Sequence, residues 1–355
     1  MRLYLKKSVL EAALGRIHRI FDEFNDVMVS FSGGKDSTVV LDLVKRVARE
    51  RNQLPVKVLF LDQEAEWEAT VTYMRLIMSN PEVQPLWYQI PFRLFNSASC
   101  FNTWLHCWEP GKEWIRDKEP NSIKENTLGV DRFGDVLDKV VVSTFPESGA
   151  TFIGMRAEES PARALAMASP TYKDITWGRK YPTKRSIYGF FPIYDWSYSD
   201  VWRYIYENSL PYNELYDKMY ALGVKTTAMR VSSVCHETAL RSLIQLSEIE
   251  PTTWLKISAR LAGANTVKTL KSDSFKCPDK LPYMFKDWYE YRDYLFENLV
   301  DDQHKEQMAN TLKGCDKYEN TKYAEKAVQV QITTIICGDL FGTKIKNFKA
   351  SCVYG

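Results

Sequence analysis

The stretch MVSFSGGKDSTVVLDLV, residues 28–44, decides the fold. Its apolar start predicts a strand, its two adjacent glycines a turn, and the residues from about 37 onward an amphipathic helix. Backbone N–H groups at a helix start are unpaired, the helix dipole favours anions there, and glycines let a ligand approach closely. We therefore predict a phosphate-binding turn made of Ser32, Gly33, Gly34, Lys35, Asp36 and Ser37.

The composition, 45% hydrophobic and 26% charged, is that of an ordinary globular protein. The chain of 355 residues is long enough for two structural units. The net charge of +2 gives no global field that would favour nucleic acid or a membrane surface. We find no signal-peptide pattern at the start and no apolar run of about 18 residues that would span a bilayer. The seven cysteines are an odd count without repeated spacing, which suits free thiols in a reducing cytoplasm. We therefore expect a cytoplasmic protein.

Strand and helix patterns alternate over the first 200 residues, which is typical of a doubly wound, mostly parallel α/β sheet. The predicted strands are 27–31, 56–62, 86–90 and 151–155, and the predicted helices between them are 7–24, 37–51 and 66–79. In such sheets ligands bind at the carboxyl ends of the strands. The glycine turn, Asp62 and Arg156 all follow predicted strands, so we expect them at one edge of the sheet.

The pattern changes after about residue 205. Residues 236–262 and 283–312 read as helical, and the tail VQVQITTIICGDLFG, 328–342, reads as a strand and a loop. We therefore divide the chain into an α/β nucleotide-binding domain, 1–205, and a smaller, mainly helical C-terminal domain, 206–355.

The hexapeptide SGGKDS lacks the upstream glycine of a Walker A loop and is no dinucleotide fingerprint. Directly after an apolar strand it resembles the PP-loop of N-type ATP pyrophosphatases and of sulfonucleotide reductases, in the adenine nucleotide alpha-hydrolase-like superfamily. Three later segments resemble the same proteins in the same order, and the last two resemble segments of phosphoadenosine phosphosulfate (PAPS) reductases and of the small subunit of bacterial ATP sulfurylase. They are FLDQEAEW (60–67), FIGMRAEESPARA (152–164) and PIYDWSYSDVWRYIYENSLPYNELYD (192–217).

This resemblance implies ATP as the ligand, Mg²⁺ as its companion, and attack of a substrate oxygen on the α-phosphate with release of pyrophosphate. Lys35 then opposes the charge on the leaving pyrophosphate. Asp36 holds Mg²⁺ or caps the helix, and Asp62 binds the same metal or a ribose hydroxyl, or is a simple turn residue. Arg156 and Arg163 supply planar forks for phosphate or an anionic substrate. The catalytic set is thus Lys35, Asp36 and Arg156, while Glu158, Glu159 and Arg163 could equally be an ion-paired, solvated helix start.

The alternative activity is sulfonucleotide reduction. Reductases of this type use a cysteine in a C-terminal E-C-G-L-H motif, and this sequence lacks that motif. The nearest candidates are Cys315, Cys337 and Cys352, and the Cys-Cys pair and C-x-x-C of the iron–sulfur branch are also missing. This departure favours an adenylating enzyme over a PAPS reductase.

Other cysteines could carry chemistry of their own. Cys235, next to a histidine, is a candidate reactive thiol at the mouth of the site. Cys100, His106 and Cys107 could contribute to a zinc site, although free cysteines are often buried small apolar residues. The aromatic segment 87–116 that contains them forms either a lid or, as we favour, core packing.

The whole chain also resembles a bacterial and phage subfamily of PAPS-reductase-like proteins with a C-terminal domain of unknown function. Members of that subfamily are commonly encoded beside a ParB-like protein and have been named immunoglobulin-binding-protein regulators. The resemblance implies a third class of function, a nucleotide-binding regulator acting with a ParB-like partner on DNA. The acceptor substrate and the oligomeric state, with a homo-oligomer among the options, stay open.

Overall fold

The computed structural model describes residues 6–95, 104–231, 233–234, 240–260 and 276–354. A six-stranded sheet has the strand order β3-β2-β1-β6-β8-β7, and β4 pairs with β5 in a two-stranded antiparallel sheet. The strands are β1 (Val27–Ser30), β2 (Val56–Leu61), β3 (Val83–Tyr88), β4 (Phe92–Phe95), β5 (Trp104–Cys107), β6 (Ser148–Ile153), β7 (Gly178–Lys180) and β8 (Ser186–Phe190). All pairs in the larger sheet are parallel except β7 with β8.

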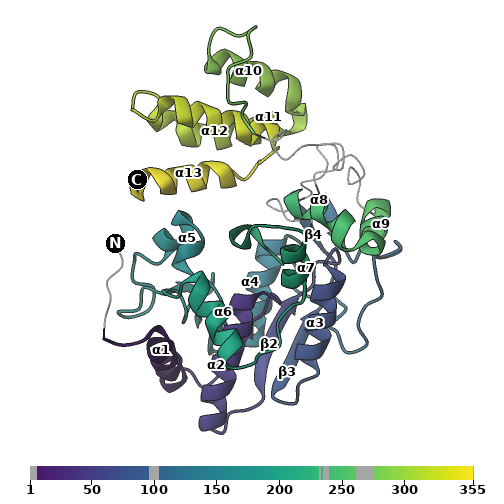
Figure 1. Cartoon of the computed structure of the whole chain (residues 1–355), viewed down its shortest axis with the longest axis vertical. Coiled ribbons are helices and arrows are strands. Elements are labelled where there is room, and N and C mark those ends of the chain that lie inside the picture. Colours follow the sequence, from purple (N-terminus) through teal and green to yellow (C-terminus); the bar gives the residue numbers. More distant parts are fainter. Residues whose placement is uncertain (1–5, 96–103, 232, 235–239, 261–275, 355) are drawn as a thin grey trace.

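Helices cover both faces of the larger sheet (Figure 1). Those of the first 260 residues are α1 (Val9–Glu23), α2 (Lys35–Glu50), α3 (Glu68–Met78), α4 (Phe133–Thr144), α5 (Pro161–Ala166), α6 (Tyr198–Glu207), α7 (Leu215–Ala221), α8 (Leu240–Ile249) and α9 (Pro251–Arg260). Successive residues of a strand point to opposite faces. Val58 of β2 accordingly belongs to the core cluster that contains residues of α1, α2 and α6, whereas Leu59 belongs to the cluster that contains residues of α4, α8 and α9. The predicted doubly wound, mostly parallel α/β fold is confirmed.

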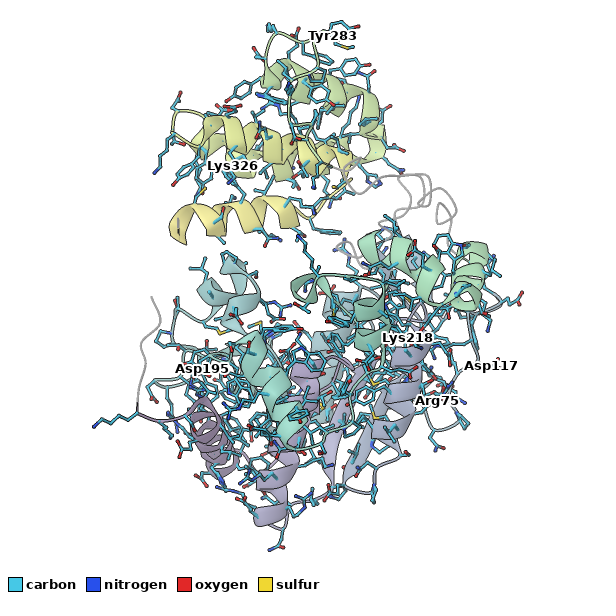
Figure 2. The ribbon with its side chains drawn as sticks, in the orientation of Figure 1. Arg75, Asp117, Asp195, Lys218, Tyr283 and Lys326 are labelled. Carbon is cyan, nitrogen blue, oxygen red and sulfur yellow. The ribbon has the colours of Figure 1, made fainter. Side chains whose placement is uncertain are left out.

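Local signals at the helix starts agree with this arrangement. Ser8 begins α1 with a reciprocal capping box to Glu11, and Ser197 begins α6 in the same way with Asp200. Asp200 is thus the third-position partner of the capping residue. Arg16 of α1 donates to both carboxylate oxygens of Asp195, which ties α1 to the segment before α6 (Figure 2).

Helices α10 (Trp288–Leu299), α11 (Asp302–Leu312), α12 (Ala324–Ile336) and α13 (Thr343–Tyr354) form a C-terminal bundle (Figure 1). The bundle has its own buried core, drawn from residues such as Leu295, Met308 and Ile332. Tyr283 lies at its outer end, where the side chain is 95% exposed (Figure 2). The bundle contacts the α/β unit at Phe341, whose ring lies against the ring of Trp104.

The strand predicted in the tail 328–342 is wrong, because α12 occupies most of it. The run of β-branched residues favours a strand locally, but packing overrides such propensities. Ala327, Val328, Ile332 and Ile335 are buried at helical spacing in the bundle core. One helix face therefore gains more by burial than the strand preference could supply.

Packing bears on where the units divide. Leu215, Leu243 and Trp254 share a core cluster with Met28 and Leu59 of the central strands. The bundle core, in contrast, is drawn from residues between Cys277 and Cys352. The division at residue 205 stays a prediction, and a later boundary is an alternative to it. No helix within the described ranges is long and apolar enough to cross a membrane.

Candidate nucleotide site

The PP-loop, residues 32–37, joins β1 to α2. Gly33 has a φ of +73°, a backbone conformation that residues with a side chain rarely adopt. Gly34 is the N-cap residue of α2 and makes no side-chain hydrogen bond. The hydroxyl of Ser37 donates to the Gly34 carbonyl oxygen at 2.9 Å and lies 3.3 Å from the Ser32 hydroxyl. The loop thus brings two hydroxyls beside a helix start of the kind that binds anions.

Asn213 fixes the loop from the segment before α7. Its amide nitrogen is 2.9 Å from the Thr70 hydroxyl oxygen and 3.4 Å from the Gly33 carbonyl oxygen, and the side chain is fully buried. A Cβ at Gly33 would lie 3.1 Å from the Met74 side chain. Helix α3 and Asn213 therefore hold the loop from the side away from α2.

The predicted catalytic residues Lys35, Asp36 and Arg156 come together in the structure. Lys35 Nζ is 2.9 Å from one oxygen of Asp36, and Arg156 Nε donates to the other. All three side chains are buried, and two cations face one carboxylate. Arg156 also reaches Glu158, 3.0 Å away, but Glu158 is 39% exposed, so water screens its charge. The buried trio therefore retains a net positive charge.

Gly154 sets the approach of β6 to the start of α2. A Cβ at this position would lie 2.7 Å from the backbone nitrogen of Ser37 and 2.8 Å from the carbonyl carbon of Asp36. Such contacts are far below van der Waals distance, so only glycine fits. The close approach allows Arg156, two residues later, to reach Asp36. Gly154 lies in the segment 152–164, which resembles PAPS reductases, but its steric role depends on contacts that only the folded chain shows.

Tyr216 of α7 is a site residue that the sequence did not single out. Its hydroxyl oxygen accepts a hydrogen bond from the Lys35 backbone N–H at 3.1 Å. The rings of Tyr216 and Tyr198 lie 5.6 and 5.5 Å from Lys35 Nζ, within cation–π range. Burial raises the pKa of Tyr216, so its hydroxyl keeps its proton.

Arg163 lies on α5 and pairs with Glu159 one turn earlier. The same Glu159 carboxylate accepts the backbone N–H of Arg156 at 3.0 Å. Arg163 is 39% exposed, and its pairing with Glu159 is that of an ion-paired helix start. A phosphate-binding role for Arg163 stays a prediction.

Asp62 follows β2 and is fully buried. One carboxylate oxygen accepts from Trp87 Nε1 at 2.8 Å and from Gln89 Nε2 at 2.9 Å. The other accepts from Arg116 and from the Glu64 backbone N–H. Its hydrogen-bonding capacity is therefore used within the protein.

A magnesium site made of Asp36 and Asp62 does not fit this arrangement. Both carboxylates already face cations, and those two residues show no direct contact with each other. The described part of the chain also contains no group of three or more acidic, histidine or cysteine side chains suited to a metal ion. We therefore derive no step through a metal.

Glu66 lies four residues beyond Asp62, with a side chain that is 3% exposed. Burial, reinforced by the charge of Asp62, raises the pKa of Glu66 to about 8. Arg116 acts in the opposite direction, because its positive charge favours the ionised carboxylate. Glu66 is thus largely protonated at neutral pH.

The cysteines show few signs of reactivity. Cys100 and Cys235 lie outside the described residues, so the candidate reactive thiol and one of the three predicted zinc ligands are not placed, whereas His106 and Cys107 lie in β5. Cys107 is buried and its thiol contacts the Gln63 carbonyl oxygen at 3.2 Å. Burial raises the pKa of Cys315 to about 11 and also raises that of Cys337. Two of the thiols considered for reduction are therefore protonated at neutral pH.

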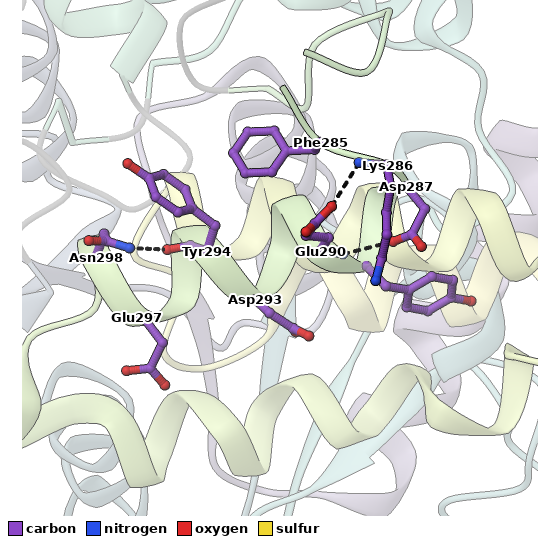
Figure 3. Close-up of a pocket in the computed structure, with 9 residues that line it drawn as sticks. Phe285, Lys286, Asp287, Glu290, Asp293, Tyr294, Glu297 and Asn298 are labelled. Carbon is purple, nitrogen blue, oxygen red and sulfur yellow. Dashed lines mark hydrogen bonds between the residues drawn. The ribbon is translucent and has the colours of Figure 1, made fainter. Parts of the chain in front are cut away.

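A surface cavity of about 560 Å³ lies on the C-terminal bundle along α10 (Figure 3). Its lining is acidic and aromatic, and includes Phe285, Asp287, Glu290 and Tyr294. None of the predicted nucleotide-site residues lines it. The cavity is thus separate from the residues of the PP-loop.

Solved structures with a similar fold share little sequence with this chain. A Candida glabrata FMN adenylyltransferase is 15% identical with a TM-score of 0.37, over 60% of this chain and 62% of that one. A Candida auris PAPS reductase in a phosphate complex is 16% identical with a TM-score of 0.33, over 63% and 95%. These likenesses are too distant to carry an argument about activity.

Comparison with known sequences is more specific. The Escherichia coli K12 protein YbdN is 31% identical over 278 residues, 75% of this chain and 68% of that protein. An adenosine 5'-phosphosulfate reductase of Geobacillus thermodenitrificans is 27% identical over 59% of this chain and 76% of its own length. Residues 26–223, more than half of the chain, match the phosphoadenosine phosphosulfate reductase domain. The chain therefore belongs to the phosphoadenosine phosphosulfate reductase domain family, within the PP-loop superfamily of nucleotide-binding enzymes.

Proposed function

We propose that the protein binds ATP at the PP-loop and transfers its adenylyl group to a second substrate. An oxygen of that substrate forms a bond to the α-phosphorus, and the bond from this phosphorus to the bridging oxygen of the β-phosphate breaks. The electron pair leaves with pyrophosphate. Sulfur transfer is the purpose that the family suggests.

The observation that supports this proposal is the buried trio of Lys35, Asp36 and Arg156 at the start of α2. Asp36 holds the two cations in place before the ligand arrives, so little reorganisation is needed on binding. Lys35 then stabilises charge that accumulates on the leaving pyrophosphate, and Arg156 stabilises negative charge on the non-bridging oxygens of the α-phosphate. The Ser32 hydroxyl supplies a further donor to phosphate oxygens, and the Ser37 hydroxyl can do so once it leaves the Gly34 carbonyl oxygen.

Sulfonucleotide reduction is the second candidate, and the family match favours it. That reaction needs a nucleophilic thiolate, which forms readily only where the thiol pKa is lowered. The raised pKa values of Cys315 and Cys337 count against those two thiols. Cys235 would then be the residue to test first.

A regulatory role with a ParB-like partner on DNA is the third candidate. It follows from the subfamily resemblance alone, and the net charge of +2 gives it no electrostatic support. Such a regulator would bind nucleotide at the PP-loop without releasing pyrophosphate or sulfite.

Product analysis separates these candidates. The purified protein is incubated with ATP labelled at the α-phosphate and Mg²⁺, with and without cell extract as a source of acceptor. A parallel reaction contains PAPS and reduced thioredoxin and is assayed for sulfite. We expect AMP-containing product and pyrophosphate from the wild-type protein and a loss of about 100-fold or more in Lys35→Ala. Sulfite formation, or pyrophosphate release that Lys35→Ala leaves unchanged, would contradict the proposal.

A further inference from the structure

Arg116 lies in the loop after β5, and its side chain is only 9% exposed. One terminal nitrogen, Nη2, contacts Asp62. The other two guanidinium nitrogens, Nε and Nη1, are buried and have no hydrogen-bond partner among the residues that the structure describes. The ring of Trp108 covers the group, with its centre 5.0 Å from the guanidinium carbon.

Unpaired buried donors are costly, more so on a charged group, and proteins retain few of them. Arg116 has two, and further unpaired buried atoms lie on the segment that follows β2. They are Gln63 Oε1 and Trp67 Nε1, on either side of Glu66. Polar atoms left unpaired at one strand end indicate a place where a ligand completes the hydrogen bonding.

Charge indicates an anion as that ligand. Asp62 receives three neutral donors besides Arg116, so it does not need the full charge of the arginine. Glu66 faces Arg116 electrostatically from the same segment as Asp62, and Glu119 does so from the arginine's own loop. Glu119 also binds Arg75 at 2.8 Å, and Lys118 adds a positive charge beside Trp108. With Glu66 protonated, Arg116 has charge available for one further acceptor.

The location relates this group to the PP-loop. Strands β1 and β2 are adjacent and parallel, with Ser30 in register with Leu59. The residues that follow them, the PP-loop and Asp62, therefore leave the sheet at the same edge. We propose that Arg116 is an oxyanion-binding subsite that holds an acidic group, such as a sulfate or carboxylate, of the second substrate beside the nucleotide. This inference rests on the proposed function, because it assigns the place of the acceptor.

Sulfate titration by calorimetry tests the subsite, with sodium acetate as the carboxylate probe. The full-length wild type is compared with Lys35→Ala, which impairs the PP-loop, and with Arg116→Lys, which retains a charge opposite Asp62 but lacks the guanidinium donors. We expect sulfate binding to persist in Lys35→Ala and to weaken about tenfold or more in Arg116→Lys, the loss of at least one charge-assisted hydrogen bond. Binding that disappears in Lys35→Ala and is unchanged in Arg116→Lys would overturn the proposal, as would a wild type that binds neither anion.

A second variant guards against misfolding. In Asp62→Asn/Arg116→Gln, made in the Lys35→Ala background so that the PP-loop is impaired, the buried pair becomes neutral on both sides, and the asparagine oxygen can still accept from Trp87 and Gln89. A cooperative thermal transition together with lost sulfate binding supports the subsite, whereas retained binding contradicts it. Failure of the proposed function would show differently, as absent pyrophosphate release in a wild type that still binds sulfate through Arg116.

Discussion

Asp36 and Asp62 are buried carboxylates at neighbouring strand ends, and their surroundings differ. Asp36 faces two cations, Lys35 and Arg156, at a helix start, and its side chain is 12% exposed. Asp62 faces one cation, Arg116, and several neutral donors, and it is fully buried. The first cluster has two cations for one carboxylate at the start of a helix. In the second, three neutral donors share Asp62 with Arg116, and two guanidinium nitrogens of Arg116 have no partner among the described residues.

This difference separates two uses of the same residue type. In the PP-loop cluster the carboxylate keeps cations ready for an anionic ligand. After β2 the carboxylate organises the protein itself, because Trp87, Gln89 and the loop of Arg116 all converge on Asp62. The four predictions that follow test this contrast.

The largest expected effect is on stability, in Asp62→Ala. Removing this carboxylate leaves Arg116 charged and buried without its partner, which costs on the order of 3–5 kcal/mol in the free energy of unfolding. Asp36→Ala is the matched variant, with an expected cost of ~1–3 kcal/mol because Arg156 keeps Glu158 as a second partner at 3.0 Å. Urea denaturation of both variants measures the two costs. Equal losses would show that the two clusters do not differ in the way we describe.

Glu66→Gln sharpens the contrast through pH. The folded-state pKa of about 8 lies above the ordinary value of 4.5, so the folded protein retains a proton that the unfolded chain releases. Stability therefore falls as pH rises from about 4.5 to 8. Glutamine cannot ionise, so the variant should exceed the wild type by on the order of 3 kcal/mol at pH 8 and match it near pH 4.5. If the unfolding free energies of wild type and variant instead differ by the same amount at every pH in this range, the pKa of Glu66 is not raised in the folded protein.

How much of this could be read from the sequence depends on distance along the chain. The strand, turn and helix around the PP-loop follow from local pattern, and the α/β alternation places Asp62 and Arg156 after strands, as the structure confirms. The meeting of Asp36 with Arg156 agrees with that shared edge. Predictions of this kind succeed because backbone periodicity and strand order fix the positions of strand ends.

Partners chosen by tertiary packing could not be predicted. Nothing in the sequence around Arg116 indicates that this arginine, 54 positions from Asp62, is the one that reaches it. Tyr216 and Gly154 act through contacts with the PP-loop that only the folded chain defines. The strand predicted in the tail is wrong for the same reason, because burial of one helix face in the bundle core outweighs the local strand preference.

Gly154→Ala tests how rigidly the PP-loop cluster is positioned. The added Cβ meets backbone atoms of Asp36 and Ser37, which cannot rotate away, so the start of α2 must shift. We expect a loss of ~1–3 kcal/mol in unfolding free energy. The displaced trio should also lower the rate of pyrophosphate release by about 100-fold.

Gly134→Ala is the control for that substitution. Gly134 lies within α4 in open space, where alanine stabilises a helix by ~0.5–1 kcal/mol. Thermal melts and the pyrophosphate assay are run on both variants. A Gly154→Ala protein with wild-type turnover would mean that the loop adjusts freely, and the contrast with the cluster around Asp62 would lose its geometric basis.

The smallest expected effect is in Tyr216→Phe, which removes one hydroxyl from the PP-loop cluster. That hydroxyl accepts the Lys35 backbone N–H, and its own proton can be donated to a phosphate oxygen. Its loss should weaken ATP binding about fivefold, equivalent to ~1 kcal/mol, as measured by calorimetry with a nonhydrolysable analogue. Tyr212→Phe is the control, because the Tyr212 hydroxyl binds Asp217 instead. Tighter ATP binding by Tyr216→Phe would show that the hydroxyl competes with the nucleotide for the Lys35 N–H. Tyr216 would then occupy this donor in the absence of nucleotide and would not contribute to ATP binding.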